Sequence, residues 1–219
     1  MLSIIICSVS PEKLKKAKDC IDATIGVEHE FIVIDNNVRK WPLTRAYNEG
    51  AKMARFPYLL FVHEDVIFHA CGWGNFVIDK LREQDCGVVG YAGTKVMSGS
   101  YSGWCQDGDW NVLLLWQGTA AGRTELRASG VTLEHPFEEV VALDGLAMFM
   151  RRDLWEEFRF NEESLTGFHC YDVDFSLSVN QRYKNYVCGV VDIFHYSPGN
   201  FNEAWFREVL KTYRKWHDR

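Results

Sequence analysis

The sequence lacks the marks of several large classes of protein. No apolar run approaches the ~18 residues that a membrane span needs, and the N-terminus has neither the basic segment nor the small-residue cleavage site of a signal peptide. The seven cysteines are scattered and form no CxxC pair, which indicates reduced thiols rather than a disulfide framework or a zinc site. We therefore expect a soluble, cytoplasmic protein, with peripheral attachment to the inner face of the membrane as an alternative.

Familiar nucleotide-binding and hydrolase motifs are also missing. Gly50 has neither a GxGxxG nor a GxxxxGK context, which leaves a Rossmann dinucleotide site and a P-loop without support. No GxSxG sequence occurs, so a serine hydrolase is not supported either. The net charge of −6 argues against a broad nucleic-acid surface, and we expect no nucleic-acid partner.

What the sequence does have is a globular composition and a regular alternation of patterns. Apolar residues make up 47% of the 219 residues and charged residues 25%, and no linker or repeat is visible, which favours one domain over residues 1–219. Short apolar runs at 2–9, 30–34, 58–62 and 87–91 predict buried strands. Helical patterns lie between them, at 13–24, at 44–55 with Thr44 as the cap, and at 73–84.

This alternation predicts an α/β fold with a doubly wound, largely parallel sheet, in which ligands bind beyond the carboxyl ends of the strands. Further along, the patterns predict a strand at 138–150, helices at 153–158 and from Tyr171, a strand at 186–193 and an amphipathic helix at 201–216. Residues 94–130 are rich in Gly, Ser and Trp and predict a long excursion that covers or lines a site, with one strand at 112–116.

The sharpest local feature is the run His63-Glu64-Asp65, directly after a buried strand. Alternate residues of an extended chain point the same way, so His63 and Asp65 can face one ligand. A carboxylate there suits Mg²⁺ or Mn²⁺, which would bridge to phosphate oxygens. The alternative is a solvated strand end in which Asp65 caps a turn.

Asp35, Asn36 and Asn37 close the second predicted strand at the same sheet edge. Such a group can hydrogen-bond a ribose or a base, and it is equally typical of an Asx turn. Asp144-Gly145 lies within an apolar strand, where a buried acid needs a partner and a glycine permits close backbone approach.

A second cluster, at 169–174, contains Asp172 and Asp174 at a predicted helix start. Asp172 is either the N-cap or a first-turn acid of that helix, or a general base that takes a proton from an attacking hydroxyl. The two aspartates should diverge once the backbone is helical, so we expect them to have different roles. His195 follows an apolar strand and is a ligand candidate only if other ligands converge on it.

The order of these clusters resembles that of family-2-like glycosyltransferases of the GT-A fold, and more closely a bacterial glycosyltransferase-like branch linked to capsule or surface-polysaccharide synthesis. The resemblance is carried by FIVIDNN, AYNEGAKMARFPYLLFVHEDV, LDGLAMFMRRDLW, RFNEESLTGFHCYDVDFSL and VVDIFHYSPG, which begin at residues 31, 46, 143, 159 and 190. It implies a GT-A-like nucleotide-diphospho-sugar transferase fold, with a mixed, mostly parallel central sheet flanked by helices.

The resemblance also implies roles for single residues. The run at 63–65 stands where the family has its DxD motif, with Asp65 as the main metal contact and His63 in place of the first aspartate. His195 would complete the metal site, and Asp172 would be the catalytic base. The implied donor-binding residues are Ser8, Asp35, Asn36, His63, Glu64, Asp144 and Gly145. One departure is Tyr171, which precedes Asp172 where the family often has a glutamate.

The resemblance implies a hexosyltransferase-like enzyme (EC 2.4). It would move a sugar, with inversion and with Mn²⁺ or Mg²⁺, from a nucleotide-diphosphate donor to a hydroxyl of a saccharide or glycolipid acceptor. UDP is the favoured donor nucleotide, and bacterial surface-polysaccharide or glycoconjugate synthesis is the implied pathway. Trp104 and Trp110, in the 94–130 excursion, could stack on the acceptor sugar or pack beneath the loop.

Two alternatives remain at this point. A catalytically silent GT-A domain would bind a nucleotide or glycan, or act as an assembly partner. A sugar nucleotidyltransferase is less favoured, because Ser8-Val9-Ser10-Pro11 stands where that class has a Gly-rich basic loop. The aromatic face of the last helix (Trp205, Tyr213, Trp216) could pack on its own core or form a homo-oligomer.

Overall fold

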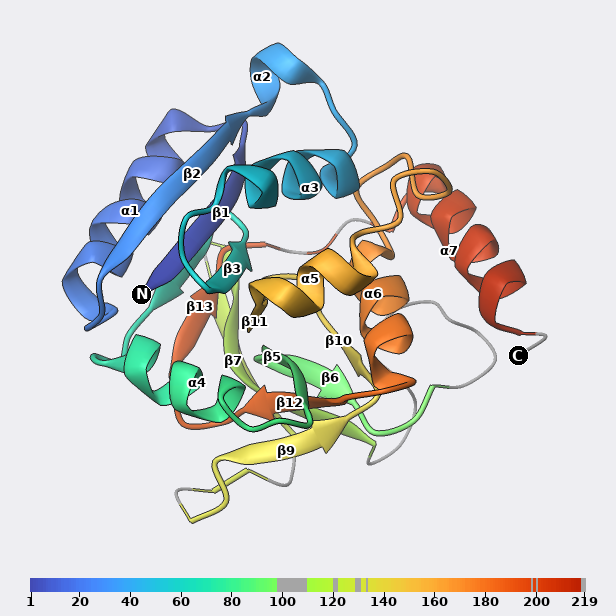
Figure 1. Ribbon diagram of the computed structural model, residues 1–219. Coiled ribbons are helices and arrows are strands. Elements are labelled where there is room, and N and C mark those ends of the chain that lie inside the picture. The colour runs from blue at the N-terminus through green and yellow to red at the C-terminus, as the bar shows by residue number, and fades with distance from the viewer. Residues whose placement is uncertain are drawn as a thin grey trace.

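A computed structural model describes residues 1–97, 110–119, 122–128, 131–132, 134–197, 199 and 201–217 (Figure 1). Its centre is a seven-stranded sheet of order β2-β1-β3-β11-β5-β12-β9. These strands are β1 (Leu2–Ser8), β2 (His29–Asp35), β3 (Tyr58–Val62), β5 (Cys86–Gly90), β9 (Phe137–Val140), β11 (Ala147–Arg151) and β12 (Lys184–Cys188). β1 pairs in parallel with β2 and β3, whereas β11 runs antiparallel between β3 and β5. The sheet is therefore mixed, as expected for the GT-A fold.

A second, six-stranded sheet has the order β10-β6-β7-β13-β4, with β8 paired to β7. Its strands are β4 (Val66–Phe68), β6 (Ala92–Thr94), β7 (Asn111–Thr119), β8 (Gly122–Ala128), β10 (Ala142–Leu143) and β13 (Ile193–His195). Three residues separate the end of β3 from the start of β4, and the antiparallel partner of β4, β13, ends opposite it. The second sheet therefore brings a late segment of the chain to the end of β3.

Helices cover both faces of the central sheet (Figure 1). They are α1 (Pro11–Thr24), α2 (Asn36–Arg39), α3 (Leu43–Met53), α4 (Trp73–Leu81), α5 (Arg152–Phe158), α6 (Tyr171–Asn180) and α7 (Glu203–Trp216). Ile4 and Ile6 of β1 join a buried cluster with residues of α1 and α4. Ile5 joins a second cluster with residues of α3, α5 and α6. This alternation explains why β1 is apolar at successive positions.

Two of the expected strands are interrupted in the structure. The strand expected at 138–150 is three strands, β9, β10 and β11, and the chain turns at 144–145 between β10 and β11. Asp144 makes this turn: its backbone N–H donates to the Ala92 carbonyl, and its Oδ1 accepts from the Leu146 N–H at 2.8 Å. The strand expected at 186–193 likewise divides into β12 and β13.

Other expectations differ in detail. Thr44 does not cap α3: it is buried inside the helix, and its hydroxyl donates to the Leu165 carbonyl at 2.9 Å. The helix expected at 73–84 ends at Leu81. Within the 94–130 excursion, β7 is longer than expected and pairs with β8, which was not predicted. Trp104 lies outside the described residues, whereas the Trp110 side chain is exposed.

The last helix, α7, packs on its own chain beside α6 (Figure 1). Of the expected aromatic face, Trp216 is buried, and Trp205 and Tyr213 are half-buried. In the part of the chain that the structure describes, no helix is both long and apolar enough to cross a bilayer.

A buried amide joins α3 to the segment after α5. Asn48 donates to the Phe160 carbonyl at 2.8 Å, and its Oδ1 accepts from the Phe160 N–H and the Trp155 indole, both at 3.1 Å. Replacing Asn48 by Ala leaves these buried groups without partners, each at a cost of about 1–3 kcal/mol before water relieves part of it.

We expect Asn48→Ala to lower the free energy of unfolding by about 3 kcal/mol in urea denaturation. Lys52→Ala, an exposed change on the same helix, should stay within about 0.5 kcal/mol of the native chain. Equal stabilities of the two variants would show that the amide bonds contribute nothing net.

Candidate active site

Polar residues from five segments meet where β1 and β3 end. The segments are the loop after β1, residues 63–65 after β3, the turn at 144–145, the first turn of α6 and the end of β13. Parallel β1 and β3 end at the same edge of the sheet, and β13 is brought there by pairing with β4, which places His195 opposite Val66. Residues far apart in the sequence therefore share one site.

Glu64 points away from its two neighbours and holds the loop after β1. Its Oε2 accepts from the Ser8 hydroxyl at 2.6 Å, from the Ser10 N–H at 3.0 Å and from the Val9 N–H at 3.2 Å. Ser8 and Glu64 are both buried. These two predicted donor-site residues therefore shape the loop that borders the site through bonds to each other and to the backbone.

His63, Asp65 and His195 form the one cluster of three or more potential metal ligands found among the described residues. Each offers a ligand atom, and these atoms all lie within 4.8 Å of one another. His195 Nε2 is 3.6 Å from Asp65 Oδ1, and the two imidazole rings are 5.6 Å apart between centroids. The structure thus adds His63 to the two residues that the sequence assigned to the metal.

The Tyr171 hydroxyl fixes the orientation of His63. It donates to the Gly145 carbonyl at 3.0 Å and lies 2.7 Å from His63 Nε2. Because the hydroxyl hydrogen is used for the carbonyl, His63 donates from Nε2 and its lone pair is on Nδ1. Burial, followed by the nearby His195, lowers the pKa of His63. A neutral imidazole is the form that binds metals.

Asp172 lies in the first turn of α6, against the turn at 144–145. Its Oδ2 accepts from the Gly145 N–H at 2.8 Å and its Oδ1 from the Val173 N–H at 2.9 Å. Burial, with a further contribution from the neighbouring Asp144 carboxylate, raises the pKa of Asp172 to about 7. A carboxylate with that pKa can accept a proton near neutral pH.

Gly145 permits the close contact that this arrangement needs. A Cβ built on Gly145 would lie 2.0 Å from the Tyr171 hydroxyl oxygen, a distance that no side chain could occupy. The absence of a side chain lets the backbone of residue 145 bond both Tyr171 and Asp172. The glycine is required here for space, as the sequence suggested.

The group at 35–37 adopts the Asx turn. Asp35 is exposed and is the N-cap of α2, where its Oδ1 accepts from the Asn37 N–H at 3.0 Å. Asn36 is buried, and its amide bonds both the N–H and the carbonyl of Trp41. Asn36 therefore closes the α2–α3 connection, while Asp35 stays accessible to a ligand.

Sequence reasoning missed the contact between Lys13 and Asp65. Lys13, in the first turn of α1, places its Nζ 3.1 Å from Asp65 Oδ2 and is half-exposed. Nothing local distinguishes it from the other lysines of α1. Tyr171 was noted only as a departure from a family pattern, and the pattern gave no sign that its hydroxyl joins His63 to Gly145.

The fold is that of the GT-A glycosyltransferases. The chain belongs to the glycosyltransferase-like family, whose family model matches residues 3–213. A search of curated protein sequences found no match to this chain.

Solved structures show the same fold at low sequence identity. A crystal structure of GalNAc-T7 with UDP, GalNAc and Mn²⁺ matches with a TM-score of 0.68 and 11% identity, over 100% of this chain and 49% of that one. The mannosyltransferase PcManGT from Pyrobaculum calidifontis, in complex with GDP-Man and Mn²⁺, matches with a TM-score of 0.62 and 13% identity, over 100% of this chain and 64% of that one. The chain thus spans about half of the first structure and under two thirds of the second.

The bonds of Glu64 generate a stability prediction. Glu64→Ala leaves the Ser8 hydroxyl and two backbone N–H groups unpaired and should lower the free energy of unfolding by about 2–4 kcal/mol. Glu64→Gln keeps an oxygen acceptor and should lose about 1 kcal/mol. Chemical denaturation measures both, with exposed Glu28→Ala as the control. Native-like stability of Glu64→Ala would contradict the anchoring role.

Proposed function

We propose that the protein transfers a sugar from a nucleotide-diphosphate donor to a hydroxyl acceptor, with inversion and with the help of a divalent cation. The observation that carries the proposal is the bond between His63 and Tyr171. Through it, a cluster of candidate metal ligands lies beside Asp172, the residue that follows Tyr171. The proposed site for the leaving diphosphate and the proposed proton acceptor are thereby adjacent.

The ligand set supports a transition-metal ion such as Mn²⁺. His63, Asp65 and His195 supply two imidazole nitrogens and one carboxylate oxygen, and imidazole suits Mn²⁺ and later divalent metals better than Mg²⁺. Tyr171 orients His63 as an outer-shell partner of a metal ligand would. When bound, such a cation would neutralise negative charge on the leaving diphosphate. Lys13, beside Asp65, adds a positive charge at the same place.

Asp172 is the proposed general base. It takes the proton of the acceptor hydroxyl as the acceptor oxygen forms its bond to the anomeric carbon. The bond from that carbon to the diphosphate oxygen breaks, and its electron pair leaves with the diphosphate. Attack from the face opposite the leaving group inverts the anomeric configuration. The two backbone N–H bonds to Asp172 hold the carboxylate in place.

The donor, the pathway and the cellular location are proposed in more general terms. The two similar structures hold UDP with GalNAc and GDP-Man, each with Mn²⁺, which supports a nucleotide-sugar donor without choosing its base. Asp35 is the proposed nucleoside contact, because it is exposed at the sheet edge. Asp144 and Gly145 border the proposed sugar position. A hexosyl donor, a role in bacterial surface-polysaccharide or glycoconjugate synthesis and a cytoplasmic location remain proposals from the sequence.

The metal assignment predicts a specific pattern of Mn²⁺ affinities. Asp65→Asn and His195→Ala should each weaken Mn²⁺ binding by more than about tenfold, because each removes a ligand. Mn²⁺ should bind more tightly than Mg²⁺ to the native chain. Electron paramagnetic resonance titration measures free Mn²⁺ directly. His29→Gln, a histidine outside the cluster, is the control, and native affinity in His195→Ala would rule out the cluster.

The base assignment predicts loss of turnover with retained binding. Asp172→Asn should lower kcat by about 100-fold or more, while a UDP-sugar or GDP-sugar with Mn²⁺ still raises its melting temperature. At 100 times the dissociation constant, a ligand adds ~2.7 kcal/mol of stability. Donor binding without transfer in the native chain would favour the catalytically silent domain instead.

The raised pKa of Asp172 adds a pH signature. Asp172 is protonated below about pH 7 and cannot then accept a proton, so kcat should rise with pH through that value. The folded chain holds this proton at pH values where the unfolded carboxyl has lost it, so stability falls as pH rises from about 4 to 7. Relative to Asp172→Asn, the native chain should therefore lose stability between pH 5 and 7. Parallel unfolding curves at each pH would contradict the raised pKa.

A further inference from the structure

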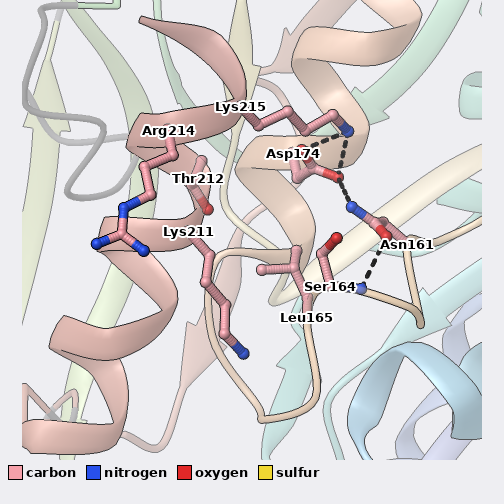
Figure 2. A pocket seen from close by; sticks show the side chains of 8 residues that line it. All are labelled: Asn161, Ser164, Leu165, Asp174, Lys211, Thr212, Arg214 and Lys215. Atoms are coloured by element: carbon pink, nitrogen blue, oxygen red, sulfur yellow. Dashed lines mark hydrogen bonds and ion pairs between the residues drawn. The ribbon is translucent and has the colours of Figure 1, made fainter.

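Asp174 is a buried carboxylate one half-turn along α6 from Asp172, and it faces the opposite way. Its side chain is 4% exposed. Its Oδ1 accepts from the Trp216 indole N–H at 2.8 Å and lies 2.7 Å from Lys215 Nζ. Its Oδ2 accepts from the Asn161 amide at 3.3 Å (Figure 2). All of these partners lie outside α6.

The partners join α6 to two separate segments. Trp216 and Lys215 are at the end of α7, and Asn161 is in the connection between α5 and α6. α7 contacts the same connection a second time, where Lys211 Nζ is 3.3 Å from the Thr166 hydroxyl. Asp174 is thus the point at which α7, the connection and α6 are bonded together.

Side-chain bonds matter here because apolar packing is incomplete. An open pocket of about 340 Å³ lies between α7 and the connection, and Asp174, Asn161 and Lys215 are among the residues that line it (Figure 2). Side chains that line an open pocket make fewer contacts with other side chains than those in a closed core. Polar bonds to a buried charge therefore contribute a large share of the attachment at this place.

The start of α6 needs such attachment. Its N-cap, Cys170, has a φ of 60° and makes no side-chain cap bond. A left-handed backbone at a residue other than glycine costs on the order of 1 kcal/mol or more and persists only when its surroundings hold it. Tyr171 and Asp172 follow immediately. The residues proposed to orient the metal site and to accept the proton therefore belong to a helical turn that is held by tertiary contacts.

We infer that Asp174 is a positioning residue for the transfer reaction: its bonds to Trp216 and Lys215 hold the first turn of α6 so that Asp172 stays against Gly145. This inference rests on the proposed function of Asp172. Small displacements of a reacting group can cost large factors in rate, up to about 100-fold for 1 Å. Loss of the bonds lets the first turn move and exposes Asp172 further to water.

The test removes the bonds while keeping the bulk of the side chains. Trp216→Phe deletes the indole N–H, and Lys215→Met deletes the charge. Each should lower kcat by about three- to tenfold with less than a twofold change in the donor KM, because the donor ligands are untouched. Lys215→Arg keeps a positive charge beside Asp174 and should therefore retain most of the kcat that Lys215→Met loses.

Two further measurements separate positioning from simple loss of stability. Val77→Ala weakens the core under α4, away from α6, and should lower the melting temperature without changing kcat per folded molecule. The midpoint of Asp172 titration, followed by ¹³C NMR of the carboxyl group, should fall in Trp216→Phe as water enters, and should not move in Val77→Ala. This second readout needs no enzymatic activity.

The outcomes distinguish a failure of the positioning role from a failure of the proposed function. A lower kcat and a lower Asp172 midpoint in Trp216→Phe and Lys215→Met, with recovery in Lys215→Arg, support the positioning role. Unchanged kcat and midpoint in folded Trp216→Phe and Lys215→Met overturn it. If the native chain transfers no sugar, the proposed function fails instead. If Asp172→Asn retains turnover, the assignment of Asp172 as the base fails. In either case a shifted midpoint would still show that Asp174 positions Asp172.

Discussion

The hydroxyl of Tyr171 is the contact on which the site depends. It accepts from His63 at the end of β3 and donates to Gly145 in the turn before β11, so one oxygen atom connects the central sheet, that turn and α6. Without it, the imidazole of His63 could rotate, and the backbone of residue 145 would lose one of its two bonds to α6. The candidate metal cluster and the proposed base are therefore two parts of one hydrogen-bonded unit.

Much of this arrangement could be predicted from the sequence because it follows from strand ends. The expected limits of β3 were confirmed, and so was the start of α6 at Tyr171. Asp172 and Asp174 diverge as expected, because residues two apart on a helix face different directions. These features depend on short-range periodicity, which a single sequence displays directly.

The remaining features depend on contacts between distant parts of the chain. The break at 144–145 was not predicted, because the surrounding residues are apolar. The turn combines a local bond from the Leu146 N–H to the Asp144 side chain with a backbone bond to Ala92, in β6. Lys13 and Asp174 each bond a partner that lies more than 40 residues away in the sequence. Tyr171 bonds a glycine that lies 26 residues away. The likeness to GT-A enzymes supplied the class of site, whereas its internal bonding came only from the structure.

The space left by Gly145 has a consequence for how this protein can change over evolution. Residues 145 and 171 share one small volume, so a side chain at 145 is compatible only with a smaller residue at 171. A single substitution at 145 would displace the tyrosine and, through it, His63. The two positions therefore form an epistatic pair: a lineage that acquires a side chain at 145 must first lose the aromatic ring at 171, together with the control that the ring has over His63.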